Sequence, residues 1–238
     1  MSWNWVSVRP RVSLPETPRL ALTLAVAGLF SGLVIVGTYR GTLPAIEANQ
    51  AEALRRAVLE VLPGAERMAG LAWSEEAGAL VPAGDAAAPA VYAGYTEGGR
   101  FVGYAVPASG AGFQDTISLL YGYDPDRGRI VGMAVLESRE TPGLGDRIYK
   151  DETFVGRFRD LAPEPRVELV KEEPGAPNEV DAITGATISS AAVVDIINAG
   201  NEAWLERLEA SPAPPAPEEG SAEPAPAATG GPIPGGRE

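Results

Sequence analysis

The segment from Asp181 to Leu208 reads DAITGATISSAAVVDIINAGNEAWLERL and contains the clearest helical pattern of the soluble part of the chain. Apolar and small residues recur there at helical spacing and form one stripe: Val193, Ile197, Gly200, Trp204 and Leu208. Polar residues lie off this stripe: Asp195, Asn198, Glu202 and Glu206. We therefore predict a helix over Ser189–Leu208, preceded by a polar loop.

The loop before this helix carries the hydroxyl groups of Thr184, Thr187 and Ser189. A helix N-terminus presents unpaired backbone N–H groups and a partial positive charge, which together favour phosphate. Gly185 allows the backbone a positive φ or a close approach to a ligand. The segment has neither the glycine spacing nor the lysine of a Walker A loop. Taken alone, Thr187 or Ser189 is most simply interpreted as an ordinary helix N-cap.

A second loop, Glu140-Thr141-Pro142-Gly143-Leu144-Gly145-Asp146, follows a β-prone segment. Its Pro-Gly pair suits a type II turn, because proline fixes φ and glycine takes a positive φ. By itself this loop is most simply interpreted as a connection with Leu144 packed into the core. Arg139, Arg147 and Lys150 flank it and would moderate the local negative charge.

The remaining soluble segments predict an α+β fold with one mostly antiparallel sheet. Short β-prone runs separated by turn residues predict four strands: Val91–Tyr95, Phe101–Pro107, Thr116–Tyr123 and Ile130–Leu136. We expect loops with no more than one short strand over Met68–Ala90, a short helix over Lys150–Phe158 and a strand over Arg166–Lys171.

The segment Leu20–Tyr39 has twenty residues without a charge. A helix of that length spans about 30 Å, the thickness of a bilayer core. The alternative is a cleaved signal peptide, but the run exceeds the usual apolar region of about 7–15 residues and no A-x-A-like site ends it. Thr42 can N-cap a helix that stops at Pro63-Gly64, and we expect this helix to continue from the membrane segment into the globular part.

The charges around this segment predict the orientation and the domain limits. Arg9, Arg11 and Arg19 precede it, and the positive-inside rule then places residues 1–19 in the cytoplasm. The transmembrane helix would cover residues 20–39 and the extracytoplasmic domain residues 43–210. Residues 211–238 contain eight prolines and five glycines, which predicts a disordered tail. The location would be the bacterial inner membrane, with the main domain periplasmic.

Composition excludes several kinds of chemistry. The 238 residues include no cysteine and no histidine. Disulfides, iron–sulfur clusters, thiolate zinc sites and histidine-based triads are therefore impossible. Any redox chemistry must depend on a bound organic cofactor. The net charge of -13 argues against a nucleic-acid partner.

Together, the two loops resemble the FMN-binding domain of the G subunit of the Rnf/Rsx ion-translocating electron transport complex. That family is related to the C subunit of the sodium-translocating NADH:quinone reductase. Its D-x-x-[ST]-G-A-[ST]-x-[ST] motif is matched by Asp181, Thr184, Gly185, Ala186, Thr187 and Ser189. Its E-T-P-G-L-G motif is matched by residues 140–145 without change, and Gly112–Asp115 and Gly132 are similar to the family as well.

The resemblance implies a membrane-anchored electron carrier with FMN joined to Thr187 by a phosphoester bond. It implies cofactor contacts from Asp181, Thr184, Gly185, Ala186 and Ser189 in one loop, and from Glu140, Thr141, Gly143 and Leu144 in the other. A separate flavin transferase would attach the FMN, taking it from FAD with magnesium. The chain itself would hold no metal and no catalytic side chain.

The implied function is electron relay between NADH- and ferredoxin-linked carriers, coupled to ion transport, with other integral subunits as partners. Two alternatives remain open from the sequence. One is the C subunit of the quinone reductase. The other is a non-enzymatic membrane-anchored scaffold or binding domain, in which Thr187 only caps a helix.

Overall fold

The computed structural model describes residues 17–83, 89–211 and 213–216, and it forms two compact units, Met1–Ala48 and Asn49–Glu238. Helix α1 (Thr17–Val61) is continuous and accounts for the described part of the first unit. The prediction that the helix continues from the membrane segment into the globular part is confirmed, but the N-cap role of Thr42 is wrong, since Thr42 lies inside α1. Its Oγ1 donates to the carbonyls of Thr38, at 3.0 Å, and Tyr39, at 3.1 Å.

The large apolar side chains of Leu20–Tyr39 are exposed over 50% to 73% of their surface. Among the described residues, α1 is long and apolar enough to cross a membrane. Exposed apolar side chains of this kind suit contact with lipid. The helix therefore fits a single-pass membrane anchor, as the sequence predicts.

The second unit is built on a six-stranded antiparallel sheet with the strand order β2-β1-β3-β4-β5-β6. The strands are β1 (Arg67–Ser74), β2 (Ala79–Pro82), β3 (Val91–Tyr95), β4 (Phe101–Ala111), β5 (Thr116–Asp124) and β6 (Arg129–Glu137). The four predicted strands are confirmed as β3 to β6, and β4 is four residues longer than expected. The α+β fold class is confirmed too.

The prediction of loops with no more than one short strand over Met68–Ala90 is wrong, because two paired strands, β1 and β2, lie in that segment. β1 pairs with β3 from Arg67↔Tyr95 to Leu71↔Val91. Its sequence RMAGLAWS is poor in β-branched residues. Pairing with a fully buried neighbour outweighs this weak strand propensity.

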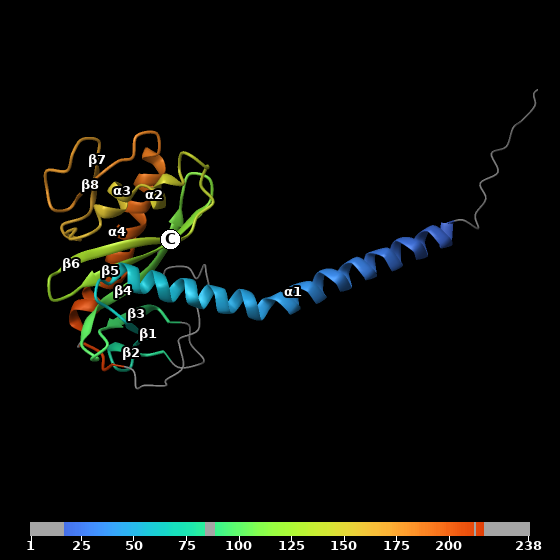
Figure 1. The fold of residues 1–238 in the computed structure, drawn as a ribbon, viewed down its shortest axis with the longest axis horizontal. Coiled ribbons are helices and arrows are strands. Elements are labelled where there is room, and N and C mark those ends of the chain that lie inside the picture. The colour runs from blue at the N-terminus through green and yellow to red at the C-terminus, as the bar shows by residue number, and fades with distance from the viewer. Residues whose placement is uncertain (1–16, 84–88, 212, 217–238) are drawn as a thin grey trace, which may run out of the picture. The chain divides into compact units, whose positions relative to one another are not determined.

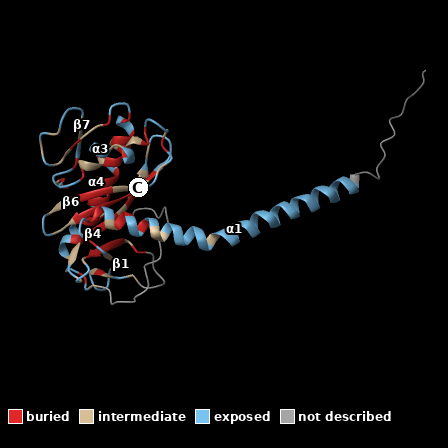
Figure 2. Cartoon of the chain, in the orientation of Figure 1, coloured by how far each residue is buried: buried red, intermediate tan, exposed pale blue. Residues whose placement is uncertain are grey.

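Both faces of the sheet are covered, which explains why its central strands are the most buried (Figures 1 and 2). Helix α4 (Thr187–Ala210) packs on one face with a large cluster that includes Val106, Tyr121 and Ile197. The last turns of α1 pack on the other face, where Val58, Val61 and Leu62 join Tyr92, Ala105 and Leu120. The whole predicted stripe of α4 is buried.

Between β6 and α4 lie two short helices and a parallel strand pair. These are α2 (Arg147–Lys150), α3 (Glu152–Gly156), β7 (Glu168–Val170) and β8 (Glu179–Asp181). The predicted helix over Lys150–Phe158 is interrupted at Asp151, whose carboxylate caps α3. Asn198 is buried rather than on the polar side of α4. Its amide bonds both backbone groups of Val167.

After α4 the chain lies against β3. The Tyr95 hydroxyl donates to the carbonyls of Pro214, at 3.2 Å, and Pro215, at 3.1 Å. Residues 217–238, most of the segment predicted to be disordered, lie outside the described residues. The disorder of that segment stays a prediction.

Gly122 of β5 lies directly against the end of α1. A Cβ atom there would collide with the carbonyl of Val61, the last residue of α1. We expect Gly122→Ala to lower the free energy of unfolding by about 1–3 kcal/mol, the usual cost of overpacking. Thermal unfolding of the detergent-solubilised chain, followed by near-ultraviolet circular dichroism, measures this.

The matched control is Gly156→Ala in α3, where an added Cβ has nothing within 4 Å. It should leave the unfolding midpoint unchanged or slightly raised. Equal midpoints for the two variants would contradict the close packing of α1 on the sheet.

Candidate functional site

Helix α4 begins without a side-chain cap. Its N-cap residue is Ala186, so the interpretation of Thr187 or Ser189 as the N-cap is wrong. The backbone N–H groups of Thr187, Ile188 and Ser189 find no acceptor in the loop before the helix, among the described residues. A 24-residue helix thus presents three free donors and the positive end of its dipole.

The hydroxyl groups at this end of α4 differ in accessibility. Thr184 and Thr187 are exposed, whereas Ser189 and Ser190 are buried. Ser190 Oγ donates to the Ala186 carbonyl at 2.9 Å and accepts from the Ile183 N–H at 3.2 Å. Within the described part of the chain, the Thr187 hydroxyl makes no hydrogen bond. Thr187, in the first turn of α4, is therefore a free and accessible hydroxyl.

The buried carboxylate of Glu140 joins the two loops. Its Oε2 accepts from the Ser189 hydroxyl at 2.6 Å across 49 residues of sequence, and its Oε1 accepts from the Gln114 N–H at 3.0 Å. A Cβ atom on Gly145 would lie 2.5 Å from Glu140 Oε2 and 2.9 Å from Ser189 Oγ. Only glycine therefore lets the second loop approach α4 this closely.

Hydrogen bonding decides the ionisation of Glu140, which is 5% exposed. Burial acts to raise its pKa, but hydrogen bonds from the Ser189 hydroxyl and from the Gln114, Phe113 and Asp115 N–H groups outweigh that effect. The pKa of Glu140 is consequently below its ordinary value of 4.5. The carboxylate is charged at neutral pH and is committed to partners within the chain.

Leu144 is 52% exposed, so the interpretation that it packs into the core is wrong. Its Cδ2 lies 3.9 Å from the position that a Cβ atom would take on Gly185, which has a φ of 86°. The tips of the two loops are therefore adjacent. Thr141 supports this turn, because its carbonyl accepts from the Leu144 N–H at 3.1 Å.

Asp146 was not among the predicted site residues, yet it shapes the second loop. Its Oδ1 accepts from the Gly143 N–H at 2.8 Å, and its Oδ2 accepts from Lys150 Nζ at 2.6 Å. The hydrogen bond from Lys150 is the main reason why the pKa of Asp146 lies below its ordinary value. The i,i+4 spacing of these two residues was the signal available in the sequence.

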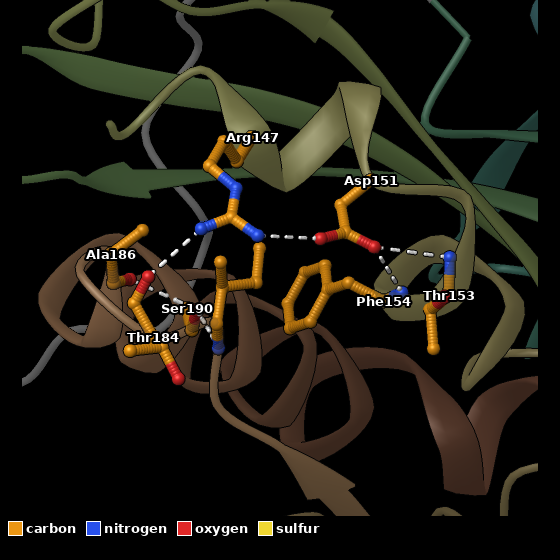
Figure 3. A network of polar contacts seen from close by, with 8 residues as sticks. Arg147, Asp151, Thr153, Phe154, Thr184, Ala186 and Ser190 are labelled. Carbon is orange, nitrogen blue, oxygen red and sulfur yellow. Dashed lines mark hydrogen bonds and ion pairs between the residues drawn. The ribbon is translucent and has the colours of Figure 1, made fainter. Parts of the chain in front are cut away.

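Arg147 links α2 to the other loop, as Figure 3 shows. Its Nη1 donates to the Thr184 carbonyl at 2.8 Å, and its Nη2 donates to Asp151 Oδ2 at 2.9 Å. Asp151 Oδ1 in turn accepts from the N–H groups of Thr153 and Phe154. The sequence indicated only a moderating charge here, and the specific contact was missed.

Asp181 ends β8 and is paired with Arg157. Arg157 Nε donates to Asp181 Oδ1 at 2.7 Å, and Nη2 donates to Oδ2 at 3.4 Å. Both side chains are about two-thirds buried. The structure therefore places Asp181 at the start of the Thr184–Thr187 loop, held by a cation from the C-terminal end of α3.

Among the described residues of the second unit, the exposed large apolar side chains lie in these segments or a few residues from them in sequence. They are Phe113, Leu136, Leu144, Tyr149 and Ile188. Phe113 precedes the Gln114 N–H that binds Glu140, and Ile188 follows Thr187. An accessible hydroxyl and a helix N-terminus are thus accompanied by apolar surface, a combination suited to a ligand with a phosphate and a flat ring.

Comparison with known proteins gives the family. A model of the FMN-binding domain matches residues 112–202, which contain both loops. The chain is 36% identical to the G subunit of the ion-translocating oxidoreductase complex of Methanosarcina acetivorans, over 77% of this chain and 92% of that protein. The chain belongs to the G-subunit family of ion-translocating oxidoreductase complexes.

Two further comparisons concern another G subunit and a solved crystal structure. It is 37% identical to the G subunit of the proton-translocating ferredoxin:NAD(+) oxidoreductase complex of Clostridium ljungdahlii, over 41% of this chain and 50% of that protein. Its fold is similar to the crystal structure of Shewanella oneidensis NqrC, with a TM-score of 0.54 and 19% identity, over 69% of this chain and all of that one. The resemblance seen in the sequence is confirmed.

Family membership and the FMN-binding domain identify the protein as a flavoprotein component of an ion-translocating oxidoreductase. Its redox chemistry then belongs to FMN and its partners to the same multi-subunit complex.

We expect Glu140→Gln to destabilise the protein by about 1.5–3 kcal/mol at neutral pH, because charge-assisted hydrogen bonds are lost in the interior. The pKa of Glu140 is lowered in the folded chain, so its stabilisation is complete above pH 4.5 and is lost as the pH falls through the lower native value. The difference in unfolding midpoint between wild type and variant should therefore shrink on acidification.

Glu137→Gln serves as the control, since Glu137 is an exposed carboxylate at the end of β6. It should change the midpoint little at any pH. A Glu140→Gln difference that stayed constant from neutral pH to about pH 3, below the ordinary range of a carboxyl group, would show that Glu140 is not the charged group described above.

Proposed function

We propose that FMN is joined to Thr187 by a phosphoester bond and that the protein relays electrons through it between ferredoxin- and NADH-linked carriers. The observation that carries the proposal is the uncapped N-terminus of α4, with the exposed, unbonded Thr187 hydroxyl in its first turn. The name of the Clostridium ljungdahlii relative supports ferredoxin and NAD(+) as the redox couples.

The residues present fit such a phosphate. The N–H groups of Thr187, Ile188 and Ser189 point out of the helix end and supply donors, and the helix dipole favours the negative charge. Ser189 and Ser190 are buried and bonded, which leaves Thr187 as the accessible hydroxyl on the helix itself. Thr184 is also exposed but lies before the helix.

A covalent bond also answers an electrostatic difficulty. Residues 41–210 carry the whole net charge of -13, because the charges of the two ends cancel. Reversible binding of an anionic nucleotide would be unfavourable in such surroundings without a cage of cations. Covalent attachment removes that requirement and prevents loss of the flavin outside the cytoplasm.

Attachment requires a separate flavin transferase that uses FAD and magnesium. The Thr187 hydroxyl oxygen bonds to the phosphorus on the FMN side of FAD, the phosphoanhydride bond breaks, and AMP leaves. The hydroxyl proton is released, and no electrons are transferred. Thr187 is thus a substrate of the transferase and not a catalytic residue.

The attached group supplies reversible acceptance and donation of electrons, and this chain supplies its surroundings. Leu144 presents an exposed apolar side chain next to Gly185, and Thr141 supports that turn. Glu140 and Asp181 support the two loops without direct contact with the flavin, since each carboxylate is already hydrogen-bonded within the chain. These contacts favour a ring held at the protein surface, where a partner subunit can exchange electrons with it.

The orientation in the membrane is part of this proposal. Arg9, Arg11 and Arg19 support a cytoplasmic N-terminus and a periplasmic domain. Small residues in the apolar part of α1, such as Gly28 and Gly32, would let other integral subunits pack closely against it.

We expect Thr187→Ser to retain the flavin and Thr187→Val to lose it completely, because valine keeps the shape of threonine without its hydroxyl. Each full-length chain is produced together with an active flavin transferase. A denaturing gel under ultraviolet light detects covalent flavin, and intact mass should exceed the sequence mass by FMN less one water.

Wild-type chain produced without the transferase is the control and should be colourless after denaturation. A Thr187→Val chain that still gave a fluorescent band would refute attachment at Thr187. An unmodified wild-type chain beside an active transferase would refute covalent attachment of FMN to this chain.

A further inference from the structure

We propose that Arg147 is a positioning residue for flavin attachment: by bridging the Thr184 carbonyl and Asp151, its guanidinium holds the turn that presents Thr187. This inference rests on the proposed function, because it assigns a role at the same site. It concerns a residue that belongs to neither of the two sequence motifs.

The geometry of the bridge is specific. Arg147 Nη1 lies 2.8 Å from the Thr184 carbonyl oxygen and Nη2 lies 2.9 Å from Asp151 Oδ2. A planar guanidinium can make both bonds at once, whereas an ammonium group is a point charge on a flexible stem. Asp151 is itself fixed, because its other oxygen caps α3. The Thr184 carbonyl is therefore tied to a rigid part of the domain (Figure 3).

The turn needs such a tie at this point. Its inner side is held by Ser190 and by the hydrogen bond from the Ala186 N–H to the Ile183 carbonyl, at 2.9 Å. Its outer side, Thr184-Gly185, is exposed and includes a glycine with a φ of 86°. Among the described residues, Arg147 is the side chain from outside the loop and α4 that bonds to residues 184–187.

Fixing the Thr184 carbonyl fixes the peptide plane that leads into Gly185, two residues before the acceptor hydroxyl. Glycine has the largest backbone freedom of any residue, so a free turn here would sample many conformations. The transferase must bring a phosphorus atom to one oxygen in one geometry, and a turn that is ordered beforehand lowers the cost of reaching it.

The competing explanation is that Arg147 acts only by its charge. Arg139 provides the matched test, since it also flanks the second loop. Its side chain is 73% exposed and its ion pairs with Asp115 and Glu137 are long, at 3.6 and 3.5 Å. Arg139 makes no hydrogen bond to residues 181–190 within the described chain. Removing it changes the local field by one charge without touching the turn.

The experiment compares wild type with Arg147→Gln, Arg147→Lys and Arg139→Gln in the full-length chain. The initial rate of flavin attachment is measured with a flavin transferase, FAD and magnesium. Amide hydrogen exchange of the Ala186 N–H, which donates to the Ile183 carbonyl at 2.9 Å, is measured on the same chains before any flavin is attached. Thermal unfolding identifies a variant that fails to fold, and Arg147→Lys is the milder of the two substitutions at Arg147.

We expect both Arg147 variants to be modified at least about tenfold more slowly than wild type, because a charge-assisted hydrogen bond is lost. Exchange of the Ala186 N–H, whose hydrogen bond to the Ile183 carbonyl lies in the turn that Arg147 holds, should be at least about tenfold faster in Arg147→Gln. Arg139→Gln should match wild type in both measurements.

Three outcomes overturn the inference: wild-type attachment in Arg147→Lys, an equal loss in Arg139→Gln, or slower attachment without faster exchange. The first two would assign the effect to charge and the third to contact with the transferase. A wild-type chain that takes up no FMN would instead refute the proposed function, and the exchange of the Ala186 N–H would still decide whether Arg147 orders the turn.

Discussion

The buried carboxylate of Glu140 is the constraint on which the site depends. A charge in the interior is stable only where hydrogen-bond donors surround it, and Glu140 obtains them from Ser189 and from the loop around Gln114. Three segments distant in sequence are therefore drawn to one point. The N-cap residue of α4 is Ala186, which has no side-chain acceptor, and Ser189 is bonded to this carboxylate, so the N-terminus of α4 remains open for an anion.

The sheet supports this arrangement from both faces. α4 covers one face and is anchored by Asn198, whose amide bonds both backbone groups of Val167. The last turns of α1 cover the other face, so the helix that carries the apolar anchor ends as part of the domain core. The site lies at the start of α4, where Asp146, Arg147 and Asp151 link α2 and α3 to the two loops.

Local patterns were sufficient to predict α4, the strands β3 to β6 and the two loops, because these depend on periodicity and turn residues. They were insufficient for β1, whose weak strand propensity is outweighed by pairing with β3. The N-cap interpretation was wrong because α4 already begins at Thr187, which makes Ala186 the N-cap, and the Ser189 hydroxyl instead bonds Glu140, 49 residues away. Single-sequence reasoning sees a hydroxyl before a helix but not a distant acceptor. The placement of Leu144 at the surface likewise depends on the fold. From sequence alone, an apolar residue in a turn can equally well pack into the core or contact a ligand.

The most direct test of the account is the mass of the peptide that contains Thr187, taken from the complex purified from its natural membrane. The account predicts that this peptide carries FMN less one water, with fragment ions that assign the added mass to Thr187. An unmodified peptide, or a flavin assigned to Thr184, would contradict it.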